Sequence, residues 1–311
     1  MSRARQAIGL DLSCGKCIRS GCLVKLPVVL NCRESISNDL LDGHMAGRPI
    51  GLIGVLSWVF LVSSFAAPAP AGAVDAGEIA ARLAAAYPDF VARPVGNMLE
   101  FKDGTSMKID DGLGEKPFTS WLAQPDLKDM FRFQYPAGAT PSPPAVDFDP
   151  GRARNEEFFI KIYGDCRQPG FEKTLASVAW LPKKTHQRIL ISSKNGVADH
   201  LRRVSDELDS LPGSLDVFLI PSAGGFVCRA VAGTTQRSGH AFGIAVDIAT
   251  KRSDYWRWAK GGPSNRPDYR NSIPKQIVEI FEKHGFIWGG RWYHYDTMHF
   301  EYRPELIRAE K

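Results

Sequence analysis

Two short segments of this chain together carry the side chains of a metal site. The first reads Ser-Gly-His-Ala-Phe-Gly-Ile-Ala-Val-Asp at residues 238–247, and the second reads Asp-Thr-Met-His-Phe-Glu at residues 296–301. Catalytic zinc typically takes three protein ligands and keeps a fourth position for water. His240, Asp247 and His299 supply that number of ligands. Bound zinc lowers the pKa of its water to about 7, which provides a nucleophile at neutral pH.

Such a centre also needs a group that moves protons. Asp296 lies three positions before His299, and in an extended or turned segment it can reach the open side of the metal. A single histidine near a strand is more often a structural, hydrogen-bonded group than a ligand. However, the combination of His-x6-Asp with glycine and alanine at fixed places is much rarer than its parts. We therefore predict a zinc site with Asp296 as proton shuttle.

The pattern around these motifs predicts the elements that position them. Residues 243–248 alternate small and apolar side chains, so we expect a buried strand with Asp247 near its far end. Gly239 and Gly243 mark a turn before it, which places His240 at the strand entrance. Further strands are expected at 188–192 and 217–220, with a hairpin at 98–109 around an Asp-Gly turn. Helices are expected at 78–87, 197–211 and 273–281, the last capped by Ser272 and ended by Gly285. This order predicts an α+β fold, with helices flanking an antiparallel sheet that carries the zinc site.

At these residues the chain resembles the M15 family of zinc peptidases, which shares a superfamily with lysostaphin-like enzymes and the hedgehog signalling domain. The resemblance rests on Ser-x-His-x-x-Gly-x-Ala-x-Asp and on a later carboxylate-x-x-His, and it covers roughly residues 174–304. By motif, His240, Asp247 and His299 match the zinc ligands and Asp296 matches the catalytic acid/base. The resemblance implies a hedgehog/D-Ala-D-Ala peptidase-like fold, Zn2+ as cofactor and peptidoglycan peptides as substrate.

The residue at position 296 bears on which bond is cut. The vancomycin-resistance type D-Ala-D-Ala peptidases carry Glu-x-x-His, whereas this chain has Asp296, preceded by Trp-Gly-Gly at 288–290. That combination is more similar to L-alanyl-D-glutamate endopeptidases, so we expect this activity, with a D-alanyl-D-alanine carboxypeptidase as the alternative. A non-catalytic, zinc-containing module that binds the cell wall is the alternative from another class. The presence of Asp296 argues against it.

Two further side chains are candidates for stabilising an oxyanion. Arg229 lies upstream of the first motif, where the resemblance implies a substrate contact, and a guanidinium suits a carboxylate or a developing oxyanion. A surface arginine is the alternative, since Arg237 is an equally basic neighbour. His294 is a competing ligand or a hydrogen-bond donor to the transition state, ranked below Asp296. Ser238 is either a hydrogen-bond partner of a ligand or a turn serine.

Composition, charge and chain organisation limit the possible binding partners and domain boundaries. The chain has 311 residues, 44% of them hydrophobic, with a formal net charge of +5, which suits an anionic cell-wall surface. No basic run alternates with aromatic residues, so nucleic-acid binding is not expected. We expect a small N-terminal appendage at 74–135, a Pro-rich linker at 136–155 and the M15-like peptidase domain at 156–311.

An apolar segment before these parts predicts export. Residues 45–73 have a short basic start, an apolar stretch and an Ala-x-Ala site, as in a secretory signal peptide. An uncleaved anchor is the alternative. We expect a secreted or periplasmic protein without stable membrane association after cleavage, and interpret residues 1–44 as an extra or non-native extension. Two cysteines remain in the exported part, Cys166 and Cys228, and an oxidising compartment favours a disulfide between them.

Overall fold

The part of the chain that the structure describes contains five α-helices and eight strands, together with short 3-10 helices. The computed structural model describes residues 75–264 and 266–307, so the expected signal peptide and N-terminal extension lie outside the described residues. None of the helices in the described part has the length and apolarity needed to cross a bilayer. The helices are α1 Ala76–Ala86, α2 Phe118–Ala123, α3 Glu156–Tyr163, α4 Val197–Asp209 and α5 Lys275–Lys283.

The strands form three small antiparallel sheets rather than one. The mixture of helices and antiparallel sheets is nevertheless α+β, as predicted. One sheet has the order β1-β2-β3, the second pairs β4 with β5, and the third has the order β6-β8-β7. The strands are β1 Val91–Val95, β2 Met98–Phe101, β3 Ser106–Lys108, β4 Leu175–Ala179, β5 Arg188–Ser192, β6 Ala245–Asp247, β7 Phe286–Trp288 and β8 His299–Tyr302.

The third sheet brings the two sequence motifs together. Strand β8 lies in its centre, with β6 on one side and β7 on the other. The register places Asp247 directly opposite His299 and Ala245 opposite Glu301. Because side chains directly opposite each other in an antiparallel pair share one face of the sheet, the register alone puts a ligand from each motif on the same surface.

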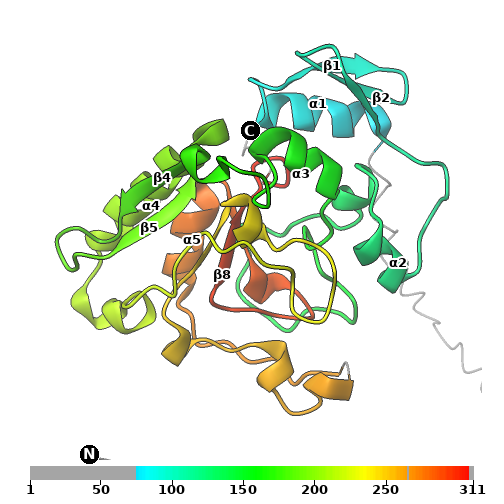
Figure 1. Cartoon of the computed structure of the whole chain (residues 1–311). Helices are drawn as coiled ribbons and strands as arrows, with labels where there is room; N and C mark the ends of the chain where they lie inside the picture. The colour runs from blue at the N-terminus through cyan, green and yellow to red at the C-terminus, as the bar shows by residue number, and fades with distance from the viewer. Residues whose placement is uncertain (1–74, 265, 308–311) are drawn as a thin grey trace, which may run out of the picture. The chain divides into compact units, whose positions relative to one another are not determined.

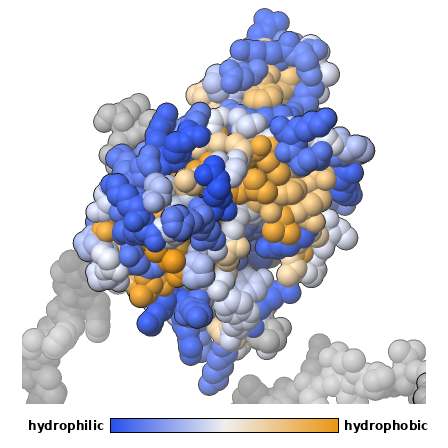
Figure 2. Space-filling model, turned by 60° about the vertical axis from the view of Figure 1, so that its left-hand side comes forward, coloured by the Kyte–Doolittle hydropathy of each residue, from blue (hydrophilic) through white to orange (hydrophobic). Residues whose placement is uncertain are grey.

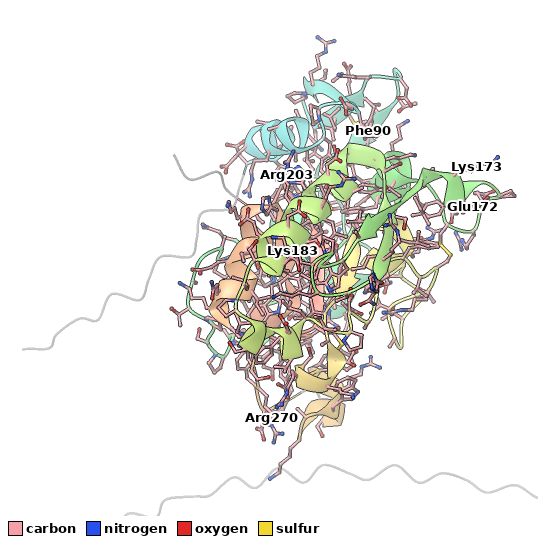
Figure 3. All side chains as sticks on the ribbon, turned by 90° about the vertical axis from the view of Figure 1, so that its left-hand side faces the viewer. Phe90, Glu172, Lys173, Lys183, Arg203 and Arg270 are labelled. Atoms are coloured by element: carbon pink, nitrogen blue, oxygen red, sulfur yellow. A yellow bond between two sulfur atoms is a disulfide. The ribbon has the colours of Figure 1, made fainter. Side chains whose placement is uncertain are left out.

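Helices α4 and α5 build the core beside the sheets. α4 packs against β4, β5 and α5, and α5 packs against β7 (Figure 1). Leu201 of α4 and Phe281 of α5 are fully buried, and the Phe281 ring stacks on Phe300 of β8 with 3.7 Å between centroids. The opposite side of α4 carries Arg203, which is exposed (Figure 3). Polar residues cover most of the face shown in Figure 2, and apolar residues are confined to patches.

The N-terminal elements are joined to the rest of the unit by buried hydrogen bonds. The Tyr87 hydroxyl, at the end of α1, donates to Oε2 of Glu305 over 2.8 Å. The Tyr135 hydroxyl donates to Oε1 of Glu282 in α5 over 2.6 Å. The described residues, 75–264 and 266–307, accordingly belong to one compact unit. The boundaries expected for appendage, linker and peptidase domain remain predictions.

Several local expectations are confirmed and two are wrong. β5, α4 and the hairpin of β2 and β3 lie where the pattern placed them. The strand expected at 217–220 is wrong, because residues Gly213–Phe218 form a 3-10 helix whose Asp216 carbonyl accepts hydrogen bonds from the next turn. Ser272 does not cap α5: its hydroxyl donates to the Arg252 carbonyl, and Pro274 takes the cap position. His240 lies in the 3-10 turn that precedes β6, at the entrance to the strand, as predicted.

Candidate metal centre and its pocket

A tight turn before β6 holds His240 in place. The turn, Gly239–Phe242, is capped by Ser238, whose Oγ accepts from the His240 amide over 3.4 Å, so Ser238 acts as a turn serine. Gly243 ends the turn at φ +66°, a backbone conformation that favours glycine. Nδ1 of His240 lies 2.6 Å from the Gly225 carbonyl oxygen. Because a carbonyl only accepts, Nδ1 carries the proton and Nε2 presents its lone pair to the site.

Three ligand atoms converge at one point. Nε2 of His240 lies 3.1 Å from Oδ1 of Asp247 and 3.2 Å from Nδ1 of His299, and the last two atoms are 3.1 Å apart. Tetrahedral zinc with ligands at about 2.0 Å requires about 3.3 Å between neighbouring ligand atoms. The observed separations agree with that requirement to within a few tenths of an ångström. The predicted ligand set can therefore hold a zinc ion with little rearrangement.

A buried carboxylate fixes the orientation of His299. Nε2 of His299 lies 3.2 Å from Oε2 of Glu301, so the ring donates there and turns Nδ1 toward the ligand cluster. Glu301 in turn accepts from Nε of Arg154 over 2.6 Å, and a second contact joins Nη2 of Arg154 to Oε2. Gly239 leaves room for this carboxylate, because a Cβ there would lie 2.5 Å from Oε2. Each ligand histidine thus has a partner that selects its tautomer.

Sequence reasoning gave no role to Glu301 or Arg154. A signal for Glu301 was present, because residues two apart on a strand share a face and His299-Phe-Glu301 places the acid beside the ligand. No local signal marks Arg154, which lies 147 positions from its partner.

The electrostatics of the cluster make metal binding dependent on pH. Burial alone would raise the pKa of Asp247, but the charges and hydrogen bonds of His240 and His299 hold it far below its usual value. Burial opposes protonation of His299, yet hydrogen bonds to Asp247 and Glu301 raise its pKa to about 9. Nδ1 of His299 therefore holds a proton that a metal ion must displace, so metal affinity should increase with pH.

Asp296 lies beside the ligands but is not one of the three converging groups. Its amide donates to the Gly289 carbonyl, and its carbonyl accepts from the His299 amide over 3.2 Å. Its Oδ1 atom is buried and has no hydrogen-bond partner among the described residues. Burial and the neighbouring charge of Asp247 raise the pKa of Asp296 to about 6. A carboxyl group with this pKa can both accept and release a proton near neutral pH.

One cavity, which we call the site pocket, opens onto these groups. Its lining includes His299, Asp296 and His294, as well as aromatic side chains such as Trp256. His294 is 3% exposed, and its ring lies against Trp256 with 4.8 Å between centroids. Four arginines also line the pocket, namely Arg152, Arg154, Arg229 and Arg237. The structure thus brings His294 and Arg229 into the same cavity as the predicted ligands and acid.

His294 has a buried partner that the sequence did not reveal. Its Nδ1 lies 2.7 Å from Oδ2 of Asp149, and its amide donates to Oδ1 of the same residue over 3.0 Å. Asp149 is fully buried and belongs to the stretch expected to be a linker. Its carboxylate thereby fixes the orientation of the ring through Nδ1. His294 is not one of the three residues whose ligand atoms converge, so the alternative of His294 as a metal ligand is not favoured.

A disulfide braces the loop that carries Arg229. Cys166 and Cys228 are bonded, with Cα atoms 5.8 Å apart, as the cysteine count predicted. The adjacent Arg229 is exposed, and the only hydrogen bond of its side chain among the described residues goes from Nη1 to the Ala230 carbonyl over 3.4 Å. Its guanidinium therefore keeps donors available at the rim of the site pocket.

A second group of acids, Asp110, Asp111 and Asp126, has the spacing of a metal site. Here a lysine takes the place of an ion: Nζ of Lys116 lies 2.6 Å from Asp111 and 3.9 Å from Asp126. Nζ of Lys128 likewise lies 2.6 Å from Asp110. The charges of this group are thus compensated by ammonium groups.

Residues 232–302 match the model of a family described as D-alanyl-D-alanine carboxypeptidase, Peptidase_M15_4. The matched segment contains His240, Asp247, Asp296 and His299, and it covers less than a quarter of the chain. This match confirms the resemblance to M15 peptidases. No curated protein and no solved structure matches the chain.

Proposed function

We propose that this protein is a zinc-dependent peptidase that hydrolyses an amide bond in the stem peptides of peptidoglycan. The observation that carries the proposal is the convergence of His240, Asp247 and His299 to separations of 3.1 to 3.2 Å. Beside them lies a buried carboxylate oxygen of Asp296 that has no hydrogen-bond partner in the described part of the chain. The M15 match supports the same class of reaction. The proposed centre lies on the β6-β8-β7 sheet, in a fold of the hedgehog/D-Ala-D-Ala peptidase type.

Each residue has a part that follows from its environment. His240, Asp247 and His299 would hold the zinc ion, which when bound supplies Lewis-acid activation of a carbonyl group and of a water molecule. Asp296 takes a proton from the attacking water and passes it to the leaving amine, which its raised pKa permits. Arg229 and His294 provide donors toward the developing oxyanion from the wall of the site pocket.

We further propose which bond of the stem peptide is cleaved. Asp296, in place of the glutamate of the D-Ala-D-Ala peptidases of vancomycin resistance, favours the L-alanyl-D-glutamate bond. The description of the matched family favours the second candidate, removal of the terminal D-alanine. Both reactions use the same centre, so the choice depends on how the site pocket places the peptide.

We also propose that the protein acts outside the cytoplasm, where peptidoglycan is accessible. The signal-like segment at residues 45–73 and the bond between Cys166 and Cys228 support this location, since disulfides persist mainly in oxidising compartments. Expression in a Gram-negative host with a tag at the C-terminus tests it. Recovery of a shortened protein from the periplasm is expected, and recovery of only full-length protein from the cytosol would contradict it.

Defined muropeptides test the activity itself. The purified protein is incubated with a stem pentapeptide, with added zinc or with a chelator, and the products are identified by mass spectrometry. We expect zinc-dependent cleavage between L-alanine and D-glutamate. Release of D-alanine alone would replace the endopeptidase with the carboxypeptidase.

Two variants separate catalysis from binding. Asp296→Ala should abolish cleavage while the protein still binds zinc. Glu279→Gln, an exposed change on α5, serves as the matched control and should cleave normally. Wild-type protein that binds the peptides but never cleaves them would leave the non-catalytic binding module as the function.

A further inference from the structure

The four arginines of the site pocket differ in how many of their donors are already used. Arg154 donates to Glu301 through two nitrogens and to the Arg152 carbonyl through the third. Arg237 contacts Glu156 through Nη1 and Asp165 through Nη2. The donors of these two side chains are used in contacts within the protein, so neither guanidinium has a pair of nitrogens left to bind a ligand.

Arg152 is different because it is anchored through one nitrogen only. Its Nη1 donates to Oδ2 of Asp149 over 2.6 Å, and its side chain forms no other hydrogen bond with the described residues. The side chain is 16% exposed and lines the site pocket together with Asp296 and Tyr255. Nε and Nη2 thus remain unengaged on a guanidinium whose position is already fixed.

The anchor of Arg152 is an ionised and rigid group. Burial alone would raise the pKa of Asp149, but the charge of Arg152 and the hydrogen bond with His294 hold it below its usual value. The fully buried Asp149 carboxylate therefore aims both side chains at once. Pre-organisation of this kind lowers the entropy cost of binding an anionic group.

Arg229 offers a contrast in the same pocket. It is exposed and contacts only a backbone carbonyl among the described residues, so its guanidinium must be immobilised when a ligand binds. Arg152 reaches the pocket from the segment before α3, outside residues 232–302 that match the M15 family model. The two arginines thus approach the pocket from different parts of the chain.

We propose that Arg152, held by Asp149, is a specificity-determining residue that binds a carboxylate of the peptide substrate next to the scissile bond. A planar guanidinium with two free nitrogens matches a carboxylate through paired hydrogen bonds. Stem peptides carry such groups on D-glutamate and at the C-terminus. This inference rests on the proposed function and adds a charge requirement to it.

Selective amidation of the substrate tests the inference. Three forms of one stem pentapeptide are compared: one with all carboxyl groups free, one with the D-glutamate α-carboxyl amidated, and one with the C-terminus amidated. For the wild-type protein, one of the two amidations should raise KM by roughly 10- to 100-fold, the range for loss of a charge-assisted pair. In Arg152→Met, the free peptide should show that same increase, and amidation should have no further effect.

The kinetic pattern distinguishes this role from a structural one. kcat for the free peptide should change little in Arg152→Met, because loss of a ground-state contact acts through KM. Zinc content and the thermal midpoint should match the wild type. Arg152→Lys keeps the charge without the planar pair and should restore part of the discrimination, and it replaces the Met variant if that variant does not fold. Arg202→Gln, on the exposed face of α4, is the matched control.

The outcomes distinguish a failure of the Arg152 inference from a failure of the proposed peptidase function. If amidation weakens binding to Arg152→Met and Arg152→Lys as strongly as to the wild type, Arg152 does not contact the carboxylate, and the inference is wrong while the peptidase remains. Equal losses of kcat for all three peptides would make Arg152 an oxyanion-stabilising group instead. If the wild-type protein cleaves none of the three peptides, the proposed function fails and the inference fails with it.

Discussion

The carboxylate of Glu301 lies 3.2 Å from Nε2 of His299, on the side of the ring opposite the ligand cluster. Glu301 is fully buried, and the guanidinium of Arg154 neutralises it. This contact selects the His299 tautomer whose Nδ1 can bind a metal ion. The quality of the proposed metal site would therefore depend on a residue that is not one of its ligands.

Glu301→Gln should weaken zinc binding without removing a ligand. A carboxamide accepts a weaker hydrogen bond from His299 and leaves Arg154 partly unpaired, so we expect zinc affinity to fall about 10- to 100-fold. Competition with a chromophoric chelator measures the affinity. Glu279→Gln should show no change, and an unchanged affinity in Glu301→Gln would mean that the contact does not orient the ligand.

Asp296→Asn should separate metal binding from catalysis. The amide cannot accept the proton of the attacking water, so we expect kcat to fall about 100- to 10,000-fold. The three ligand atoms are untouched, so zinc stoichiometry measured by atomic emission should remain that of the wild type. Loss of zinc together with loss of activity would instead place Asp296 among the ligands.

Reduction of the Cys166–Cys228 bond should destabilise the protein. The two cysteines are 62 positions apart, and a loop of that length corresponds to about 4 kcal/mol in the chain-entropy model. The double variant Cys166→Ser/Cys228→Ser should therefore unfold at a lower urea concentration than the oxidised wild type. Dithiothreitol should lower the wild-type midpoint toward that of the variant and leave the variant unchanged. A midpoint that responds to neither treatment would contradict this prediction.

His200 should contribute a loss of stability on mild acidification. Burial of its ring on α4 and the positive charge of Arg203 lower the pKa of His200 from 6.5. The unfolded chain therefore binds a proton near pH 6.5 that the folded protein does not, so this contribution to stability decreases as pH falls below that value. The raised pKa values of His299 and Asp296 act in the opposite direction, so the contribution of His200 is measured by comparing variants. His200→Asn should shift the change in urea midpoint between pH 7.5 and pH 5.5 toward greater stability at pH 5.5, whereas the exposed His186→Asn should leave that change as in the wild type.

Some elements follow from the local pattern because the physical cause is local. The apolar stripe of α4 and the apolar run of β5 each favour the local structure of their own segment, and both elements lie where the pattern placed them. The prediction of a strand at 217–220 was wrong because four consecutive apolar residues are compatible with either a strand or the end of a 3-10 helix. Contacts elsewhere in the chain decide between these structures.

For the candidate site, the sequence by itself determined which functional groups are available: the imidazoles of His240 and His299, the carboxylate of Asp247 and the nearby acid Asp296. The β6–β8 register brings two of these groups together by placing Asp247 opposite His299. Only the tertiary structure decided the supporting contacts from Asp149 to His294 and from Arg154 to Glu301, across 145 and 147 positions. A motif records residues that are neighbours along a strand or turn, whereas the partners of buried charges are chosen by packing.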